Sequence, residues 1–153
     1  MTERSAAHGV FTIERTYPHP PAKVFAAFAT EAGKAKWFGG PPEQWAELRR
    51  QFDFRVGGRE HASGRWAQTG VTSHFDCLYW DIVPNERIVY TYEMHLDDRK
   101  ISVSLATIEL EAVDGGTRLI VTEQGAFLDG YDDAGSREHG TNFLMDRMGA
   151  TLD

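Results

Sequence analysis

The sequence predicts an α+β domain in which a seven-stranded, curved antiparallel sheet wraps around a long C-terminal helix. Three observations carry this prediction. An alternating strand runs into a short helix that starts at proline, six further alternating segments follow between turn residues, and one amphipathic segment closes the chain. Because a curved sheet that grips a single helix leaves space between the two, an internal cavity is expected.

The first strand is predicted at residues 10–17, where Phe11 and Ile13 alternate with polar neighbours. Pro20 and Pro21 end this strand and start a helix, because proline is tolerated in the first turn of a helix. This helix is expected to reach about residue 30, and a second short helix follows at 31–37. Residues 1–8 are polar and are expected to form a flexible tail, so residues 9–153 make up the single domain.

Six more strands are expected, at residues 47–56, 59–66, 74–83, 88–96, 100–112 and 117–127. Turn residues separate them, among them Gly57-Gly58, Pro84-Asn85 and Gly115-Gly116. Glycine pairs of this kind favour hairpins because they adopt positive φ without steric cost.

The closing helix is predicted to start near Ser136, a residue type that is common at the N-cap. Phe143, Leu144, Met148 and Leu152 follow at helical spacing and predict one apolar stripe that faces the sheet.

Composition narrows the classes of function. The chain of 153 residues has a net charge of −7, which argues against binding to nucleic acid or to an anionic membrane surface. The sequence contains no apolar run of about 18 residues, so no membrane span is predicted. The N-terminal residues lack the apolar core of a signal peptide. Cys77 is the only cysteine, which fits a reducing, cytoplasmic location. Signature motifs for a metal, a phosphate loop or a nucleophile elbow do not occur, so no cofactor and no metal are expected.

Several short motifs occur in a characteristic order. They are Thr16-Tyr17 before residues 21–25 (PAKVF), Trp37, residues 56–59 (VGGR), residues 82–92 (IVPNERIVYTY) and residues 115–119 (GGTRL). Together they resemble the SRPBCC or START-like helix-grip superfamily, which also contains the Bet v-like folds. Within it, the chain looks like the branch of homologues of the activator of the heat-shock-protein-90 ATPase, whose bacterial single-domain members are mostly uncharacterised.

One position departs from this family pattern. The closing helix of the family often contains Gly-Trp, whereas this chain has Gly140-Thr141. The smaller side chain is expected to enlarge the cavity or to shift the helix.

Aromatic and sulfur-containing side chains are the candidate walls of the cavity. The candidates are Trp37, Phe75, Cys77, Tyr79, Tyr90, Tyr92, Met94, Phe143 and Met148. Tyrosine hydroxyls require hydrogen-bond partners when buried, so they predict either a pocket with a polar interior or rings whose hydroxyls reach water at the rim. Cys77 alternates in step with Phe75 and is expected to behave as a small hydrophobe.

Glu60 is the candidate polar anchor. It shares strand parity with Ala62 and Gly64, and on that parity its carboxylate faces the cavity and must be hydrogen-bonded, ion-paired or protonated. The opposite parity, on which Glu60 points to solvent, is the favoured interpretation.

Histidines supply two weaker hypotheses. His139 next to Glu138 is either a pocket acid or base or an ordinary pair at the start of a helix. His61 and His74 lie on neighbouring strands and either bind a metal or lie at the rim; the rim is the favoured interpretation.

Three functions follow as hypotheses. The first is a cytoplasmic protein that binds a small hydrophobic or aromatic molecule. The second, implied by the superfamily, is an enzyme of cyclase, dehydratase or hydrolase type that acts on an aromatic or polyketide-like substrate, with Glu60 or His139 as acid or base. The third is a stress-related, co-chaperone-like module that binds proteins.

Different features distinguish these hypotheses. An enzyme should hold two titratable groups within hydrogen-bond reach in the pocket, and a protein-binding module should expose an apolar patch outside it. An exposed edge strand would also allow a homodimer.

Overall fold

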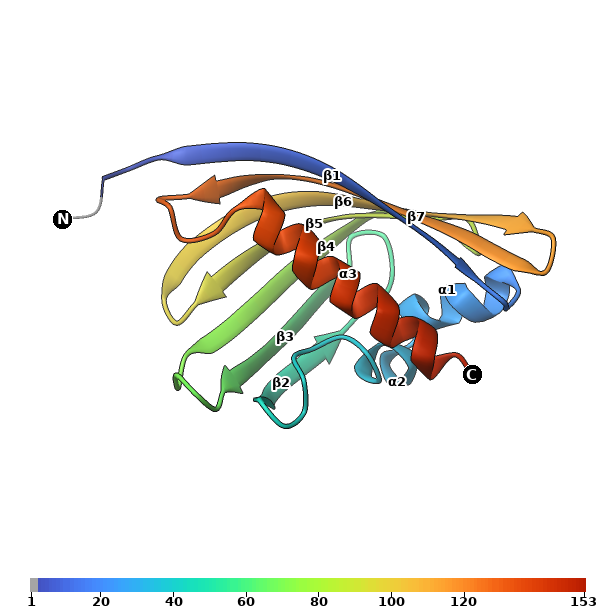
Figure 1. Ribbon diagram of the computed structural model, residues 1–153, viewed down its shortest axis with the longest axis horizontal. Coiled ribbons are helices and arrows are strands. Elements are labelled where there is room, and N and C mark those ends of the chain that lie inside the picture. Colours follow the sequence, from blue (N-terminus) through green and yellow to red (C-terminus); the bar gives the residue numbers. More distant parts are fainter. Residues whose placement is uncertain (1–2) are drawn as a thin grey trace.

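The computed structural model describes residues 3–153, which form one antiparallel sheet of seven strands and three helices (Figure 1). The elements are β1 (Ala6–Tyr17), α1 (Pro21–Ala29), α2 (Glu31–Ala35), β2 (Trp45–Phe52), β3 (Arg59–Trp66), β4 (Thr72–Val83), β5 (Arg87–Leu96), β6 (Arg99–Val113), β7 (Gly116–Leu128) and α3 (Ala134–Thr151). The predicted α+β helix-grip fold is confirmed.

The sheet has the strand order β1-β7-β6-β5-β4-β3-β2, so each strand from β2 to β7 pairs with its neighbour in sequence. The exception is β1, which crosses to the far edge and pairs with the last strand, β7. This strand begins at Ala6, and His8 pairs with Ala126. Residues 6–8, expected in the flexible tail, therefore belong to the sheet, and residues 1–2 of that tail lie outside the described residues.

The predicted turns occur where their residues require them. Gly57, Asn85 and Gly115 have φ angles of 83°, 66° and 81°. The segment predicted as a strand at 47–56 begins instead at Trp45 and ends at Phe52, and its register shifts between Glu47 and Arg49. Leu48 lies at this irregularity and is 59% exposed, although simple alternation would place it with buried residues.

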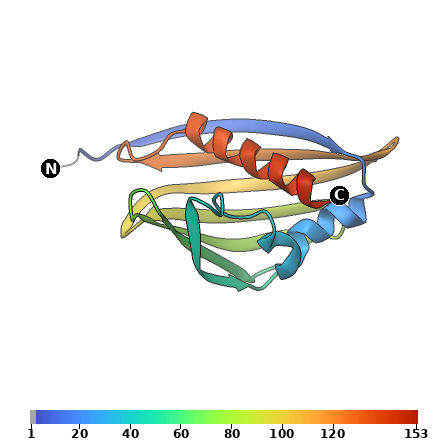
Figure 2. The same ribbon diagram turned by 60° about the horizontal axis from the view of Figure 1, so that its bottom comes forward.

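Helix α3 lies diagonally across the face of the sheet, and its C-terminal end lies beside α1 and α2 in both views (Figures 1 and 2). Its N-cap is Asp133 and not Ser136, because the Asp133 carboxylate accepts a hydrogen bond from the backbone N–H of Ser136 at 2.8 Å. The second short helix also ends earlier than expected, at Ala35, so Trp37 lies in the following loop.

The buried face of α3 differs from the predicted stripe. Thr141, Met145, Met148 and Leu152 are buried, and they follow one another at intervals of four, three and four residues. Phe143 is 42% exposed and Leu144 is partly buried. The predicted stripe was thus right at Met148 and Leu152 and wrong at its start, because the buried face begins with the polar Thr141, which a count of apolar residues leaves out. Within residues 3–153, no helix combines the length and the apolar character needed to cross a membrane.

Candidate ligand-binding cavity

A cavity of about 360 Å³ lies between the concave face of the sheet, α3 and the loop that follows α2. Aromatic and aliphatic side chains make up most of its wall. Six of the predicted ligand residues line it: Trp37, Phe75, Tyr90, Tyr92, Met94 and Phe143. Trp45 and Trp66, at the ends of β2 and β3, also line it.

The other predicted ligand residues, Glu60, Cys77, Tyr79 and Met148, are buried in the core and do not line the cavity wall. Cys77 and Tyr79 do share the inward parity of Phe75 on β4, as expected. They lie further along the strand, where the ring of Tyr79 packs against that of Phe54 with the two ring centroids 5.0 Å apart. Strand parity identified the inward face, but it did not locate the end of the cavity along that face.

A buried ion pair extends from the cavity wall into the core. Lys34, on α2, lines the cavity and donates a hydrogen bond from Nζ to Oε1 of Glu60 at 2.6 Å. The Tyr79 hydroxyl donates to the same carboxylate oxygen and lies 3.4 Å from Lys34 Nζ. Glu60 is 1% exposed, so it faces inward and the favoured solvent-facing interpretation is wrong. Lys34 supplies the cation that a buried carboxylate requires.

The surroundings of this pair are aromatic. Lys34 Nζ lies 4.5 Å from the ring centroid of Phe38 and 5.6 Å from that of Phe75, within the range of cation–π attraction. The second carboxylate oxygen of Glu60, Oε2, is buried and has no hydrogen-bond partner among residues 3–153. The pair therefore gives the cavity a polar group, the Lys34 ammonium, at a fixed position in a largely apolar wall.

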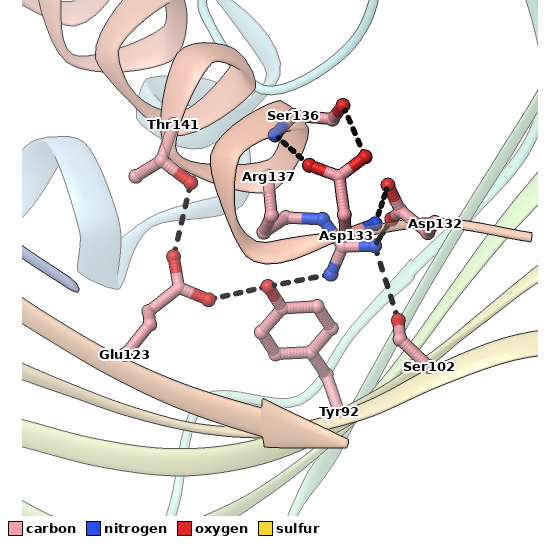
Figure 3. A network of polar contacts seen from close by, with 8 residues as sticks. All are labelled: Tyr92, Ser102, Glu123, Asp132, Asp133, Ser136, Arg137 and Thr141. Atoms are coloured by element: carbon pink, nitrogen blue, oxygen red, sulfur yellow. Dashed lines mark hydrogen bonds and ion pairs between the residues drawn. The ribbon is translucent and has the colours of Figure 1, made fainter. Parts of the chain in front are cut away.

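A second polar network lies beside the first turns of α3 (Figure 3). Its centre is Glu123 on β7, which is 4% exposed and lines the cavity. The Tyr92 hydroxyl donates to Oε1 of Glu123, and the Thr141 hydroxyl donates to Oε2 at 3.0 Å. Arg137 donates to the Tyr92 hydroxyl at 3.0 Å, so this hydroxyl links the guanidinium to the carboxylate.

Two further contacts hold Arg137 in place. Its Nη2 atom donates to Asp132 at 2.5 Å and to Ser102 Oγ at 3.0 Å. The neighbouring Asp133 caps the helix, so residues 132–137 form a tight polar turn around the start of α3 (Figure 3). The guanidinium is therefore positioned by three different elements: the turn, β5 and β6.

Burial raises the pKa of the Glu123 carboxyl, and the hydrogen bonds from Tyr92 and Thr141 oppose this shift. Burial also raises the pKa of the Tyr92 phenol, and the charge of Glu123 adds to the effect. Protonated Glu123 can donate a hydrogen bond, and ionised Glu123 can accept one. The cavity wall thus contains a carboxyl group that is suited to bind a polar atom or to transfer a proton.

The remaining candidates lie elsewhere. His139 is exposed and does not line the cavity, so the structure does not place it as a pocket acid or base. The rings of His61 and His74 lie 5.9 Å apart, and His61 Nδ1 lies 2.7 Å from Asp76. Among residues 3–153, no three His, Cys, Asp or Glu side chains are grouped closely enough to hold a metal ion. Burial raises the pKa of the Cys77 thiol to about 12, which disfavours the reactive thiolate.

Sequence reasoning missed Lys34, Glu123 and Arg137, and it noted Thr141 for its small size but not as a hydrogen-bond donor. A signal existed for Glu123, because it continues the buried parity of Leu119 and Val121 on β7. A carboxylate among the inward-facing positions of β7 is unusual in the same way as Glu60 among those of β3. Lys34 and Arg137 gave no comparable signal, since a cation on a short helix or in a first helical turn is common at the surface.

The fold and the cavity together define a helix-grip protein of the α+β class. A family model described as "Activator of Hsp90 ATPase homolog 1-like protein" matches residues 18–153. The chain therefore belongs to this family.

Two solved structures support the assignment. An uncharacterised protein from Rhizobium leguminosarum is 43% identical, with a TM-score of 0.93 over 99% of this chain and 98% of that one. A protein from Rhizobium loti is also 43% identical, with a TM-score of 0.86 over 95% of this chain and 98% of that one.

A more distant structure shows the same fold. The activator-homologue-like protein from Aeromonas hydrophila is 16% identical, with a TM-score of 0.70 over 95% of this chain and 96% of that one. A search of curated proteins found no match to the chain.

Proposed function

We propose that the protein binds a small, mostly hydrophobic or aromatic molecule in the cytoplasm. The observation that carries this proposal is the cavity of about 360 Å³, whose wall is largely aromatic and aliphatic. Small-molecule sites are typically concave, apolar and about 300–1,000 Å³ in volume, with a few polar groups that orient the ligand. Here Lys34 and Glu123 are the candidates for that orienting role.

The rigidity of these polar groups supports binding. Both carboxylates, Glu60 and Glu123, are held by hydrogen bonds from tyrosine hydroxyls, and each is linked to a cation. Groups fixed before the ligand arrives lose little conformational entropy on binding, which favours affinity.

The first test is native mass spectrometry of the protein as purified from cells, paired with a thermal-shift screen of aromatic and aliphatic compounds. A bound mass, or a compound that raises the melting temperature, supports the proposal and identifies a chemical class. A clean apo mass with no stabilising compound would count against it.

Replacing Tyr90 by tryptophan tests where the compound binds. Tyr90 lines the cavity, so the larger indole of Tyr90→Trp should occupy part of the space and weaken binding by about tenfold, while the fold is retained. Trp80→Phe, at an exposed position on the same sheet, is the control and should bind as the wild type does. Isothermal titration measures both affinities, and unchanged binding by Tyr90→Trp would place the ligand elsewhere.

A second candidate function is an enzyme, because Tyr92 and Glu123 are two titratable groups in hydrogen-bond contact on the cavity wall. In this function Glu123 would replace the sequence-based candidates Glu60 and His139 as the acid or base. The test is to incubate the identified ligand with the protein and to search for a changed product by mass spectrometry. Product formed by the wild type and lost in Glu123→Gln would favour the enzyme over the binding protein.

A further inference from the structure

The two buried polar clusters differ in their balance of charge. The first cluster contains one cation and one carboxylate, Lys34 and Glu60, whose charged atoms lie 2.6 Å apart. It is neutral as a unit. The cluster beside α3 contains three carboxylates, Glu123, Asp132 and the helix-capping Asp133, but only one cation, Arg137.

Arg137 forms its salt bridge with Asp132. Its Nη2 atom lies 2.5 Å from the Asp132 carboxylate, in a salt bridge whose side chains are both largely buried. Glu123 contacts the guanidinium only through the Tyr92 hydroxyl (Figure 3). Among residues 3–153, Glu123 forms no direct salt bridge.

The other neighbours of Glu123 carry no charge. Its cross-strand partners are Phe11 on β1 and Ala106 on β6, and Thr141 faces it from α3. An ionised carboxylate buried in such surroundings is costly unless another charge compensates it. A proton on the carboxyl would compensate this charge, and a cation on a ligand would compensate it equally well.

We propose that the cavity binds hydrophobic or aromatic amines and that Glu123 is the counter-ion of their protonated nitrogen. This inference rests on the proposed function and specifies its class of ligand. Glu123 faces the cavity, and aromatic rings such as Phe75 and Tyr92 lie in the same wall, where their faces attract cations. An anionic ligand would instead add a further negative charge beside Glu123 and Asp132.

The test compares three compounds that share one phenyl frame: phenethylamine, phenethyl alcohol and phenylacetate. Their affinities are measured by isothermal titration with the wild type, with Glu123→Gln and with Glu109→Gln. The last variant removes an equal charge from an exposed position on the neighbouring strand β6. We expect the wild type to bind the amine at least about tenfold more tightly than the alcohol, because hydrogen bonds to charged groups are the stronger ones.

The variants and the pH supply independent readouts. Glu123→Gln should lose the preference for the amine but still bind the alcohol, whereas Glu109→Gln should keep the preference. In the wild type, affinity for the amine should fall as the pH is lowered, because protons compete with the amine for Glu123. This measurement stays informative even if Glu123→Gln fails to fold.

The outcomes separate the inference from the proposed function. Equal binding of amine and alcohol by the wild type, or an amine preference that survives in Glu123→Gln, would overturn the role of Glu123 and leave the cavity as a site for neutral ligands. Tighter binding of phenylacetate would overturn it as well. If none of the three compounds binds while larger apolar compounds do, the amine inference fails and the binding function stands.

Discussion

Two charged residues of this protein lie in its core. Lys34 and Glu60 are both almost fully buried, yet each carries a charge that water would otherwise stabilise. Their mutual contact, together with the Tyr79 hydroxyl, replaces that water. A buried pair of this kind contributes little net stability by itself, but removal of one partner leaves the other uncompensated.

Lys34→Met should therefore lower the free energy of unfolding by about 3–5 kcal/mol, because Glu60 loses its cation in the core. Urea denaturation followed by circular dichroism measures the change. Lys23→Met, at an exposed position on the preceding helix, is the control and should change stability by less than about 0.5 kcal/mol.

A double variant checks the cause of this loss. Lys34→Met combined with Glu60→Gln removes both charges and keeps an acceptor for the Tyr79 hydroxyl, so it should recover most of the lost stability. A double variant that is less stable than Lys34→Met alone would contradict the ion-pair explanation.

At the scale of elements, the turns fix how the strands meet. The Gly57-Gly58 turn is attached to β4 by two backbone hydrogen bonds, from Gly57 N–H to the Tyr79 carbonyl at 2.8 Å and from Tyr79 N–H to the Gly58 carbonyl at 3.0 Å. A Cβ atom at Gly58 would lie 2.1 Å from the backbone oxygen of Asp53. The turn therefore requires glycine for close backbone approach, and it positions β3, which carries Glu60.

Gly58→Ala should destabilise the protein by about 1–3 kcal/mol, because the backbone must move to relieve the contact with Asp53. The matched control is Gly140→Ala in α3, where a Cβ atom meets no other atom within 4 Å. That change should stabilise the protein by about 0.5–1 kcal/mol, since alanine favours helix. Thermal melts of both variants provide the comparison, and equal melting temperatures would argue against the close approach at Gly58.

For the whole molecule, the cavity depends on elements from both ends of the chain. Strand β1 closes the sheet against β7, and α3 covers the concave face, so Glu123 on β7 meets Thr141 and Arg137 (Figures 1 and 3). The hydroxyl of Thr141 donates a hydrogen bond to Glu123. The Thr141 side chain is also small, so it leaves cavity space that a tryptophan at this position would fill.

The buried carboxyl of Glu123 makes stability depend on pH. Its pKa is raised in the folded state from the ordinary value of 4.5, chiefly by burial. Above that value the unfolded chain releases the proton before the folded chain does, so the unfolded state binds fewer protons. The contribution of Glu123 to the free energy of unfolding therefore falls as the pH rises from 4.5 through the folded pKa.

The measurement is the stability of the wild type relative to Glu123→Gln, followed by urea denaturation from about pH 4 to about pH 7. We expect the difference, wild type minus variant, to decrease as the pH rises. The same difference for Glu109→Gln should show no such decrease, because that carboxylate is exposed. A difference that is constant or increases for Glu123 would show that its carboxyl is not destabilised by burial.

Local sequence pattern by itself determined most of the fold. Alternation predicted the seven strands, and glycine and Pro-Asn pairs predicted the turns. These features depend on neighbours within a few residues, which the sequence presents directly. The strand parity of Glu60 was left open by the sequence, and only the structure placed this residue on the inward face. The predictions of the N-cap and of the buried stripe of α3 were less accurate, because the roles of Asp133 and Thr141 depend on hydrogen bonds that residue polarity alone does not reveal.

Only the tertiary structure decided the chemistry of the site. Lys34 meets Glu60 across 26 residues of chain, and Tyr92 meets Glu123 across 31. Such pairs depend on strand register and on the position of each helix over the sheet, which many distant contacts set together. The sequence therefore determined most of the side chains that face inward, and the packing of sheet against helices decided which of them meet, because a partner for a buried charge is selected by proximity in space.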